Sequence, residues 1–213
     1  MHVVITGAGR GIGKTLAERY RAAGHRVTGT ARDGSADLVL DVTDPAGHRA
    51  MAAALASDPV DLLICNAGIY PDKGQRLDDG YPPAMWAEAF AVNVTGSFLA
   101  IQALLPNLRA ATGKIALISS QMASDQRAPG GSYIYRASKA AVLNLGRNLS
   151  TDLRAEGIAV GIYHPGWVQT DMGGAAAEIT VDEAADGLVA RFAALDLADT
   201  GCFRTWDGRE HAF

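Results

Sequence analysis

The chain has 213 residues, of which 48% are hydrophobic, and its formal net charge is −4 at pH 7. This length and composition predict one globular domain, residues 1–213, with an ample hydrophobic core. The negative charge excludes the basic surface that nucleic-acid binding requires. No apolar run is long enough to cross a membrane and no segment resembles a signal peptide, so we expect a cytoplasmic protein without nucleic-acid or membrane partners.

Cysteines and histidines are few and scattered. The two cysteines, Cys65 and Cys202, have no metal-ligand spacing, and the five histidines form no cluster. Cys65 falls in a predicted buried strand. We therefore expect both cysteines to be packing residues of a reducing compartment, and we expect no metal site.

A short apolar strand at residues 2–6 leads directly into a glycine-rich turn and an amphipathic helix over about 14–23. Glycines let the backbone approach a pyrophosphate, and the free N–H groups and dipole at a helix start stabilise its charge. The spacing follows T-G-x-x-x-G-x-G rather than G-x-G-x-x-G. The predicted phosphate site contains Gly7, Arg10, Gly11, Ile12 and Gly13; a purely structural turn is the alternative.

Strands and helices alternate along the rest of the chain. We expect further strands at 26–31, 37–41, 60–66, 114–119, 159–163 and 202–206, and helices at 46–56, 85–108, 135–156 and 181–195. This alternation predicts an α/β fold, a doubly wound parallel sheet of about seven strands with helices on both faces. Residues 72–83 are polar and turn-rich, and we expect them to form a surface loop.

Two of these strands end in small polar residues. One runs into Asn66, Ala67 and Gly68, and another ends in Ser119 and Ser120. Parallel strands present ligand-binding groups at their carboxyl ends. Both ends should therefore line one crevice.

Tyr135 and Lys139 lie four positions apart in a predicted helix. This spacing puts the phenol and the ammonium on one face of the helix. A nearby cation favours the phenolate, so we expect the pKa of Tyr135 to fall from about 10 toward neutrality, which suits a proton donor and acceptor. The alternative is an aromatic ring packed beneath a solvated lysine.

The order and spacing of these motifs resemble the short-chain dehydrogenase/reductase family. The resemblance spans nearly the whole chain and is carried by Thr6-Gly7-x3-Gly11-x-Gly13, Asn66-Ala67-Gly68, Asn93, Ser120, Tyr135-x3-Lys139 and Pro165-Gly166. It implies a single-domain Rossmann fold and an oxidoreductase that interconverts a carbonyl and an alcohol. Within the family, residues 119–122, 130–139 and 164–174 are similar to bacterial C-factor proteins and insect carbonyl reductases.

Carbonyl reduction requires a hydride donor, a proton donor and a polar group that positions the oxygen. We expect the nicotinamide to supply the hydride, Tyr135 the proton and Ser120 a hydrogen bond to the substrate oxygen. Lys139 would lower the pKa of Tyr135 and hold the nicotinamide ribose. The stretch between Ser120 and Tyr135 is longer than is common in the family, which leaves Ser119 as an alternative and Ser124 and Ser132 as weaker candidates.

The resemblance assigns a fourth catalytic role to Asn93. In the family, an asparagine in this helix anchors a water that links the lysine to solvent. The alternative is a buried asparagine that bonds a neighbouring backbone. Asparagine has a propensity cost within an apolar helix, so its presence calls for a reason.

The choice of cofactor depends on the end of the second strand, where a carboxylate would bind the ribose of NAD and a basic residue the extra phosphate of NADP. Ala31 stands where an acid is expected, and Arg32 follows it. Two guanidinium groups, on Arg10 and Arg32, favour NADP over NAD. Alternatively, Arg32 pairs with Asp33 and Arg10 is solvated.

The resemblance also implies the remaining cofactor contacts. Tyr135 and Lys139 would touch the nicotinamide ribose, and the other residues expected at the cofactor are Asp41 and Val42 at the adenine and Pro165, Gly166, Val168 and Thr170 at the nicotinamide. The segment that follows is short, so we expect an open pocket for a small-molecule carbonyl or alcohol. Candidate rim residues are Gln121, Arg127, Tyr133 and Trp167.

Two other functions are compatible with the sequence. One is a signalling or sensing protein that binds NADP with little turnover, and the other is a structural assembly subunit. The helices that carry Asn93 and Tyr135 form subunit contacts in many relatives. We therefore expect a homodimer or homotetramer.

Overall fold

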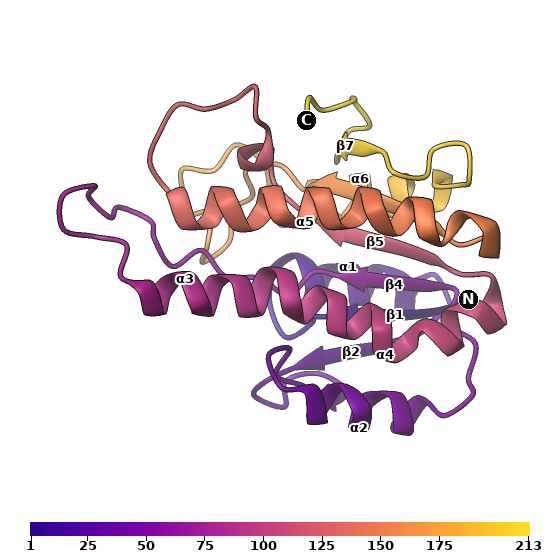
Figure 1. Cartoon of the computed structure of the whole chain (residues 1–213). Coiled ribbons are helices and arrows are strands. Elements are labelled where there is room, and N and C mark those ends of the chain that lie inside the picture. The colour runs from indigo at the N-terminus through magenta and orange to yellow at the C-terminus, as the bar shows by residue number, and fades with distance from the viewer.

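The computed structural model describes all 213 residues and contains one sheet of seven parallel strands in the order β3-β2-β1-β4-β5-β6-β7. The strands are β1 (His2–Thr6), β2 (Arg26–Ala31), β3 (Leu38–Val39), β4 (Leu62–Cys65), β5 (Lys114–Ile118), β6 (Ala159–His164) and β7 (Phe203–Thr205). Each strand pairs in parallel with its neighbours, and the arrows of β2, β4 and β5 point toward the left of Figure 1. This confirms the predicted doubly wound α/β fold.

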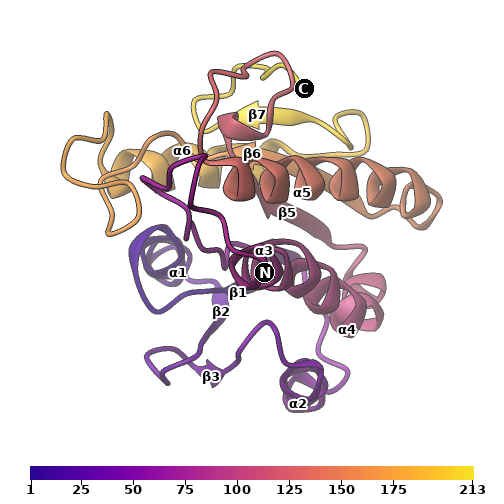
Figure 2. The same cartoon turned by 60° about the vertical axis from the view of Figure 1, so that its left-hand side comes forward.

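Helices cover both faces of the sheet. They are α1 (Gly11–Ala22), α2 (Pro45–Leu55), α3 (Pro83–Phe90), α4 (Gly96–Ala111), α5 (Tyr133–Asp152) and α6 (Val181–Ala194). Figure 2 shows α1 and α6 on one side of the sheet and α2, α4 and α5 on the other. This arrangement leaves the carboxyl ends of the strands uncovered by helices. Helices α1 and α5 begin at this end of the sheet, the open edge.

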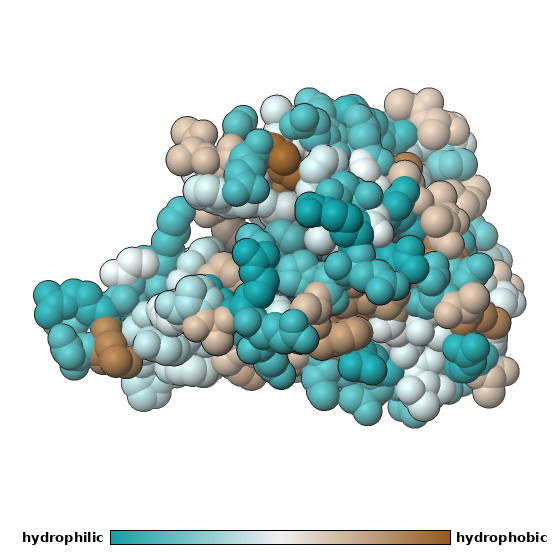
Figure 3. All heavy atoms as spheres, turned by 90° about the horizontal axis from the view of Figure 1, so that it is seen from above, coloured by the Kyte–Doolittle hydropathy of each residue, from teal (hydrophilic) through white to brown (hydrophobic).

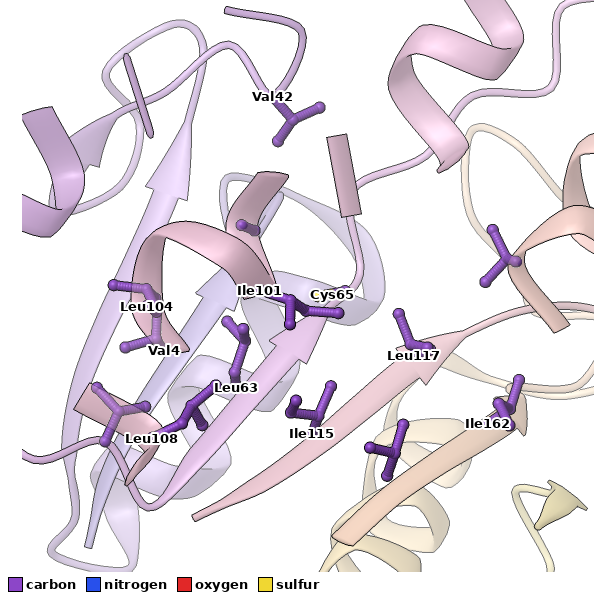
Figure 4. Close-up of a cluster of buried hydrophobic side chains, with 14 of the residues drawn as sticks. Val4, Val42, Leu63, Cys65, Ile101, Leu104, Leu108, Ile115, Leu117 and Ile162 are labelled. Carbon is purple, nitrogen blue, oxygen red and sulfur yellow. The ribbon is translucent and has the colours of Figure 1, made fainter. Parts of the chain in front are cut away.

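The central strands β1, β4, β5 and β6 are mostly apolar because both faces of the sheet are buried. Side chains that point to one face pack beneath α4, as Figure 4 shows for Val4, Leu63 and Ile115 beside Ile101 and Leu104. Their neighbours along the strands point to the other face and form a second buried cluster with α1 and α6. The central strands therefore form a rigid base for the loops at their carboxyl ends.

The bounds of several elements differ from the sequence prediction. The helix expected over 85–108 begins at Pro83 and is interrupted by a π-helical turn, Ala91–Thr95, between α3 and α4. Helix α1 begins at Gly11, because the glycine turn itself winds into the first helical turn. The expected strand at 37–41 is reduced to β3, a short edge strand. Two 3-10 turns, Gln121–Ala123 and Arg154–Glu156, follow β5 and α5.

The continuous helical run Pro83–Ala111 has the length and the mean hydropathy, 1.5, of a membrane span. One side of this run is buried against the sheet, and that side contains the polar residues Asn93, Ser97 and Asn107. A helix that packs its apolar stripe on a sheet passes the same composition test. We interpret the run as a core helix.

The outer surface shows no extended apolar area in the view of Figure 3, where hydrophobic residues form only small separate groups among hydrophilic ones. Isolated exposed apolar side chains are normal on a folded domain.

Candidate active site

The glycine turn after β1 and the loop after β4 meet where the strand order reverses, which is where open α/β sheets bind ligands. The Thr6 hydroxyl oxygen accepts hydrogen bonds from the N–H groups of Asn66, at 3.1 Å, and Ala67, at 3.2 Å. The Asn66 side-chain amide donates to the carbonyl oxygens of Thr6 and Gly7, at 3.2 and 3.0 Å. Asn66 thus fixes the backbone of the glycine turn.

Glycine is required in this turn by close packing. A Cβ atom on Gly13 would lie 2.2 Å from the Gly7 carbonyl oxygen and 2.4 Å from the Asn66 amide nitrogen. Gly7 has a φ of +69°, and a Cβ atom there would lie 2.9 Å from the Cα atom of Ala67. The turn, the start of α1 and the loop after β4 therefore form one tightly packed unit.

The start of α1 fits a phosphate group. Its N-cap residue, Arg10, makes no side-chain capping bond, and its first turn has no acidic residue. By contrast, Asp44 caps α2 and Thr180 caps α6. The first N–H groups of a helix lack intrahelical partners and attract anions. The residues present are thus compatible with the pyrophosphate of a dinucleotide.

The two candidate phosphate-binding arginines differ in their surroundings. The Arg10 guanidinium lies 2.7 Å from the Asp171 carboxylate, and both side chains are highly exposed, 77% and 79%. Arg10 is therefore ion-paired, whereas the alternative drawn from the sequence was a solvated side chain. Arg32 is exposed and forms no ion pair, and Asp33 instead accepts hydrogen bonds from Ser35.

The residues expected at the adenine follow β3 at the same edge of the sheet. The Asp41 carboxylate accepts hydrogen bonds from the Thr43 N–H, at 2.9 Å, and the Thr43 hydroxyl, at 2.7 Å. These two bonds lower the pKa of Asp41. Val42 is buried, and its carbonyl oxygen lies 2.9 Å from Nε2 of His48.

Tyr135 and Lys139 share one face of α5, as predicted, and both are buried, with exposed fractions of 8% and 4%. The Lys139 Nζ atom lies 5.7 Å from the centre of the Tyr135 ring. It donates a hydrogen bond of 2.9 Å to the Ile118 carbonyl oxygen at the end of β5. The pair is therefore fixed against the carboxyl end of the sheet and is not a ring beneath a solvated lysine.

The expected fall in the pKa of Tyr135 is not found. Burial raises its pKa to about 12, and the charges of Tyr70 and Asp72 add to this effect, while a hydrogen bond with Ser120 opposes it. Burial also lowers the pKa of Lys139, to about 8. Removal from water disfavours the charged form of either group. The prediction from the helical spacing considered the attraction between the two charges and omitted their desolvation.

Four serine hydroxyls had been candidates for the substrate contact. Ser119 donates to the Lys139 carbonyl oxygen at 2.9 Å, Ser124 donates to the Phe213 carbonyl oxygen at 3.2 Å, and Ser132 bonds the hydroxyl of Tyr70. Ser120 accepts the Met122 N–H at 3.1 Å and lies next to the Tyr135 phenol. Among the four, Ser120 is the hydroxyl that faces Tyr135.

Asn93 lies in the π-helical turn and is 1% exposed. Its side chain accepts the Ile69 N–H at 2.8 Å and donates to the Ile69 carbonyl oxygen at 3.0 Å and to the Ser138 hydroxyl at 2.9 Å. A Cβ atom on Gly68 would lie 3.2 Å from Oδ1 of Asn93 and 3.3 Å from Nζ of Lys139. Asn93 thus joins the loop after β4 to α5, in line with the buried-asparagine alternative, and it lies close to Lys139.

The loop after β6 lies over the glycine turn. Gly166 has a φ of +93°, and Val168 is buried and forms a bridge with Ile179. A Cβ atom on Gly11 would lie 3.5 Å from the Thr170 methyl group. The structure therefore brings Thr170 beside the glycine turn, while Gly166 packs against Ile179 and Trp206.

Sequence reasoning missed two residues next to Tyr135. The Tyr70 ring stacks on the Tyr135 ring with centroids 4.2 Å apart. Asp72, expected in a surface loop, is 0% exposed, and its carboxylate accepts the N–H groups of Ile134, at 2.8 Å, and Tyr135, at 3.2 Å. No local pattern marks Asp72, because its partners lie more than sixty positions further along the chain.

A polar cavity of about 180 Å³ lies at the carboxyl ends of β6 and β7. Three of the predicted rim residues line it, namely Gln121, Arg127 and Trp167. The fourth, Tyr133, packs on Tyr81 with ring centroids 5.1 Å apart and does not line this cavity. The cavity has room for a small polar group beside the loop after β6, because Gly166 also lines it.

Comparison with known proteins identifies the family to which the chain belongs. The family model described as short chain dehydrogenase matches residues 1–179. The C-signal protein of Myxococcus xanthus is 38% identical over 164 residues, which cover 76% of this chain and 98% of that protein.

Solved structures of carbonyl reductases also match the whole chain. The NADPH-bound carbonyl reductase from chicken fatty liver is 32% identical, with a TM-score of 0.90 over 100% of this chain and 98% of that one. The carbonyl reductase Sniffer of D. melanogaster is 25% identical, with a TM-score of 0.92 over 100% and 99%. The expected resemblance to C-factor proteins and insect carbonyl reductases is confirmed, and the chain belongs to the short-chain dehydrogenase family of oxidoreductases.

Proposed function

We propose that the protein is an NADP(H)-dependent oxidoreductase that interconverts a carbonyl and an alcohol, with Tyr135 as the general acid and base. The observation that carries this proposal is the buried pair of Tyr135 and Lys139 at the end of β5, with the Ser120 hydroxyl beside the phenol. A carbonyl oxygen that contacts Ser120 and Tyr135 would receive both a hydrogen bond and a proton.

The cofactor supplies the hydride when it is bound. The N–H groups at the start of α1 would bind its pyrophosphate, and Arg10 and Arg32 would bind the extra phosphate of NADP. The chicken carbonyl reductase was solved with NADPH, which supports this choice over NAD. The other proposed cofactor contacts are Gly7, Gly11, Ile12, Gly13, Asp41, Val42, Asn66, Ala67, Gly68, Tyr135, Lys139, Pro165, Gly166, Val168 and Thr170.

The protonation states suit the direction of reduction. A pKa of about 12 keeps the Tyr135 phenol protonated at neutral pH, so that it is ready to donate to an alkoxide. With a pKa of about 8, Lys139 is mostly protonated at neutral pH and loses its proton slightly above it. We propose that Lys139 stabilises the phenolate as the proton leaves, and that Asn93 keeps the surroundings of Lys139 in place. The same groups serve oxidation in reverse.

A second function is favoured by one comparison. The similarity to C-signal supports a signalling or sensing protein that binds NADP with little turnover. The buried pair of Tyr135 and Lys139, with Ser120 beside the phenol and Asn93 close to Lys139, favours the enzyme. A cytoplasmic location and a homodimer or homotetramer are further parts of the proposal.

The test measures oxidation of NADPH and of NADH by the purified protein with quinones, diketones, aldehydes and keto esters. Turnover that prefers NADPH and falls by at least about a hundredfold in Tyr135→Phe would support the proposal, because the variant lacks the proton donor. Tyr133→Phe is the matched control, since Tyr133 is partly exposed two positions away. Unchanged turnover in Tyr135→Phe would refute the mechanism. Tight NADPH binding without turnover would favour the signalling protein.

A further inference from the structure

We propose that Asp72 is a positioning residue for Tyr135: its buried carboxylate holds the first turn of α5 in place. This inference rests on the proposed function, because it concerns the residue that would donate the proton. It adds a group outside the four proposed catalytic residues.

The carboxylate of Asp72 is held entirely by the backbone of α5. Its oxygen atoms accept the Ile134 N–H at 2.8 Å and the Tyr135 N–H at 3.2 and 3.3 Å. Asp72 is 0% exposed and forms no ion pair. A buried charge requires compensation, and here the unpaired N–H groups and the dipole of the helix start provide it.

The start of α5 has no other cap. Ser132 occupies the N-cap position with a φ of +50°, in the left-handed region, and its side chain makes no capping bond. It is preceded by Gly130 and Gly131, which also have positive φ angles. A helix start that follows such a segment is poorly fixed by its own sequence. Asp72 therefore supplies from another loop the cap that α5 lacks.

Tyr70, two positions before Asp72, contacts Tyr135 through its ring. The Tyr70 and Tyr135 rings stack with an interplanar angle of 20°, and the Tyr70 hydroxyl lies 2.5 Å from the Ser132 hydroxyl. The loop after β4 thus contacts Tyr135 at both its backbone N–H and its ring. Fixing both points limits the positions of the phenol oxygen, which the proton transfer requires.

The charge of Asp72 acts on the phenol as well. The titratable groups that face Tyr135 are Asp72 and Tyr70 from the loop after β4 and Lys139 from α5, and the neutral hydroxyl of Ser120 faces it from the end of β5. Asp72 and Tyr70 both act to raise the pKa of Tyr135. Removal of the negative charge at Asp72 should therefore lower the pH at which Tyr135 loses its proton.

The test is Asp72→Asn, which keeps the size of the side chain and one acceptor oxygen but removes the charge. We expect kcat for carbonyl reduction to fall about tenfold and KM for NADPH to stay within about twofold, because the glycine turn is untouched. The high-pH limb of the kcat profile contains the ionisation of Lys139 and, above it, that of Tyr135; the Tyr135 step should move about 0.5 to 1 pH unit toward acid.

Asp44→Asn is the matched control. Asp44 caps α2 by accepting the N–H groups of Ala46 and Gly47, at 2.8 and 3.0 Å. The same substitution there should lower the melting temperature without moving the pH profile. If Asp72→Asn also leaves the high-pH limb unmoved and lowers kcat only as far as its folded fraction falls, Asp72 is an ordinary helix cap and the proposal is overturned.

A second measurement separates this proposal from the proposed function. Amide hydrogen exchange of the peptide that spans residues 133–139 needs no substrate. Faster exchange there in Asp72→Asn, with unchanged exchange in α2, would support the positioning role even if the wild-type protein reduces none of the carbonyls tested. Unchanged exchange at the start of α5 would overturn it.

Discussion

Arg10 and Asp171 form an ion pair of 2.7 Å that joins the glycine turn to the loop after β6. Both side chains are exposed, and ion pairs of this kind contribute little to stability because water and salt screen them. The Asp171 carboxylate competes with any phosphate for the Arg10 guanidinium. Affinity for NADP should therefore be limited by this pair.

Asp171→Asn is expected to tighten NADPH binding about two- to fivefold at low salt and to leave NADH binding unchanged, because only NADPH carries the extra phosphate. Calorimetric titration with each cofactor measures this. Asp182→Asn serves as the control, since Asp182 pairs with Arg19 of α1 at 2.5 Å, away from the glycine turn. An equal gain for both cofactors would mean that Asp171 does not compete for the extra phosphate.

Lys139 should make stability depend on pH in a defined window. Burial lowers its pKa from 10.5 to about 8, so between these values the unfolded chain holds a proton that the folded chain has lost. Stability from this group therefore rises as the pH increases from 8 to 10.5. We expect the free energy of unfolding of the wild type, relative to Lys139→Met, to increase by about 3 kcal/mol over this range.

Urea unfolding of both proteins at several pH values between 7 and 11 measures the difference. The control is Lys14→Met, at an exposed lysine. Its free energy of unfolding should depend on pH in the same way as that of the wild type. Parallel curves for Lys139→Met and the wild type would show that Lys139 titrates in the folded protein as it does in the unfolded chain.

Asn93→Ala should destabilise the fold by about 2–4 kcal/mol, because the buried N–H and carbonyl groups of Ile69 both lose their side-chain partner. Ser138→Ala removes only one of the three bonds of Asn93 and should cost about 1 kcal/mol. Chemical denaturation provides both values. Equal costs for the two variants would indicate that the link between Asn93 and Ile69 is not what stabilises this turn.

Gly13→Ala should disrupt the glycine turn. Its Cβ atom would lie 2.2 Å from a backbone oxygen that cannot move freely, so we expect a loss of about 2–3 kcal/mol and weaker NADPH binding. Gly24→Ala is the control: Gly24 also has a positive φ, but no atom lies within 4 Å of its Cβ position. That variant should lose about 1 kcal/mol and bind NADPH normally.

The sequence was informative where chemistry and spacing are local. Apolar runs identified six of the seven strands closely, and the helical spacing of Tyr135 and Lys139 correctly predicted that they share a face. The glycine turn could be recognised because strand, turn and helix start are consecutive. These predictions needed no knowledge of distant contacts.

The predictions that failed depend on distant contacts. The pKa of Tyr135 depends on how deeply other elements bury it, which the spacing does not report. Asp72 looked like a surface residue because it lies in a polar segment, while its partners are on α5. The interruption of the helix by a π-helical turn was also missed, because its stabilising bonds from Asn93 reach the loop after β4.

The open edge of the sheet holds two helix starts of different electrostatic character. The first turn of α1 has no carboxylate, whereas that of α5 is neutralised by Asp72. An anionic ligand is therefore attracted to the start of α1 and not to the start of α5. Its charged part is favoured beside α1, so a long ligand with one anionic end has one preferred direction across the sheet.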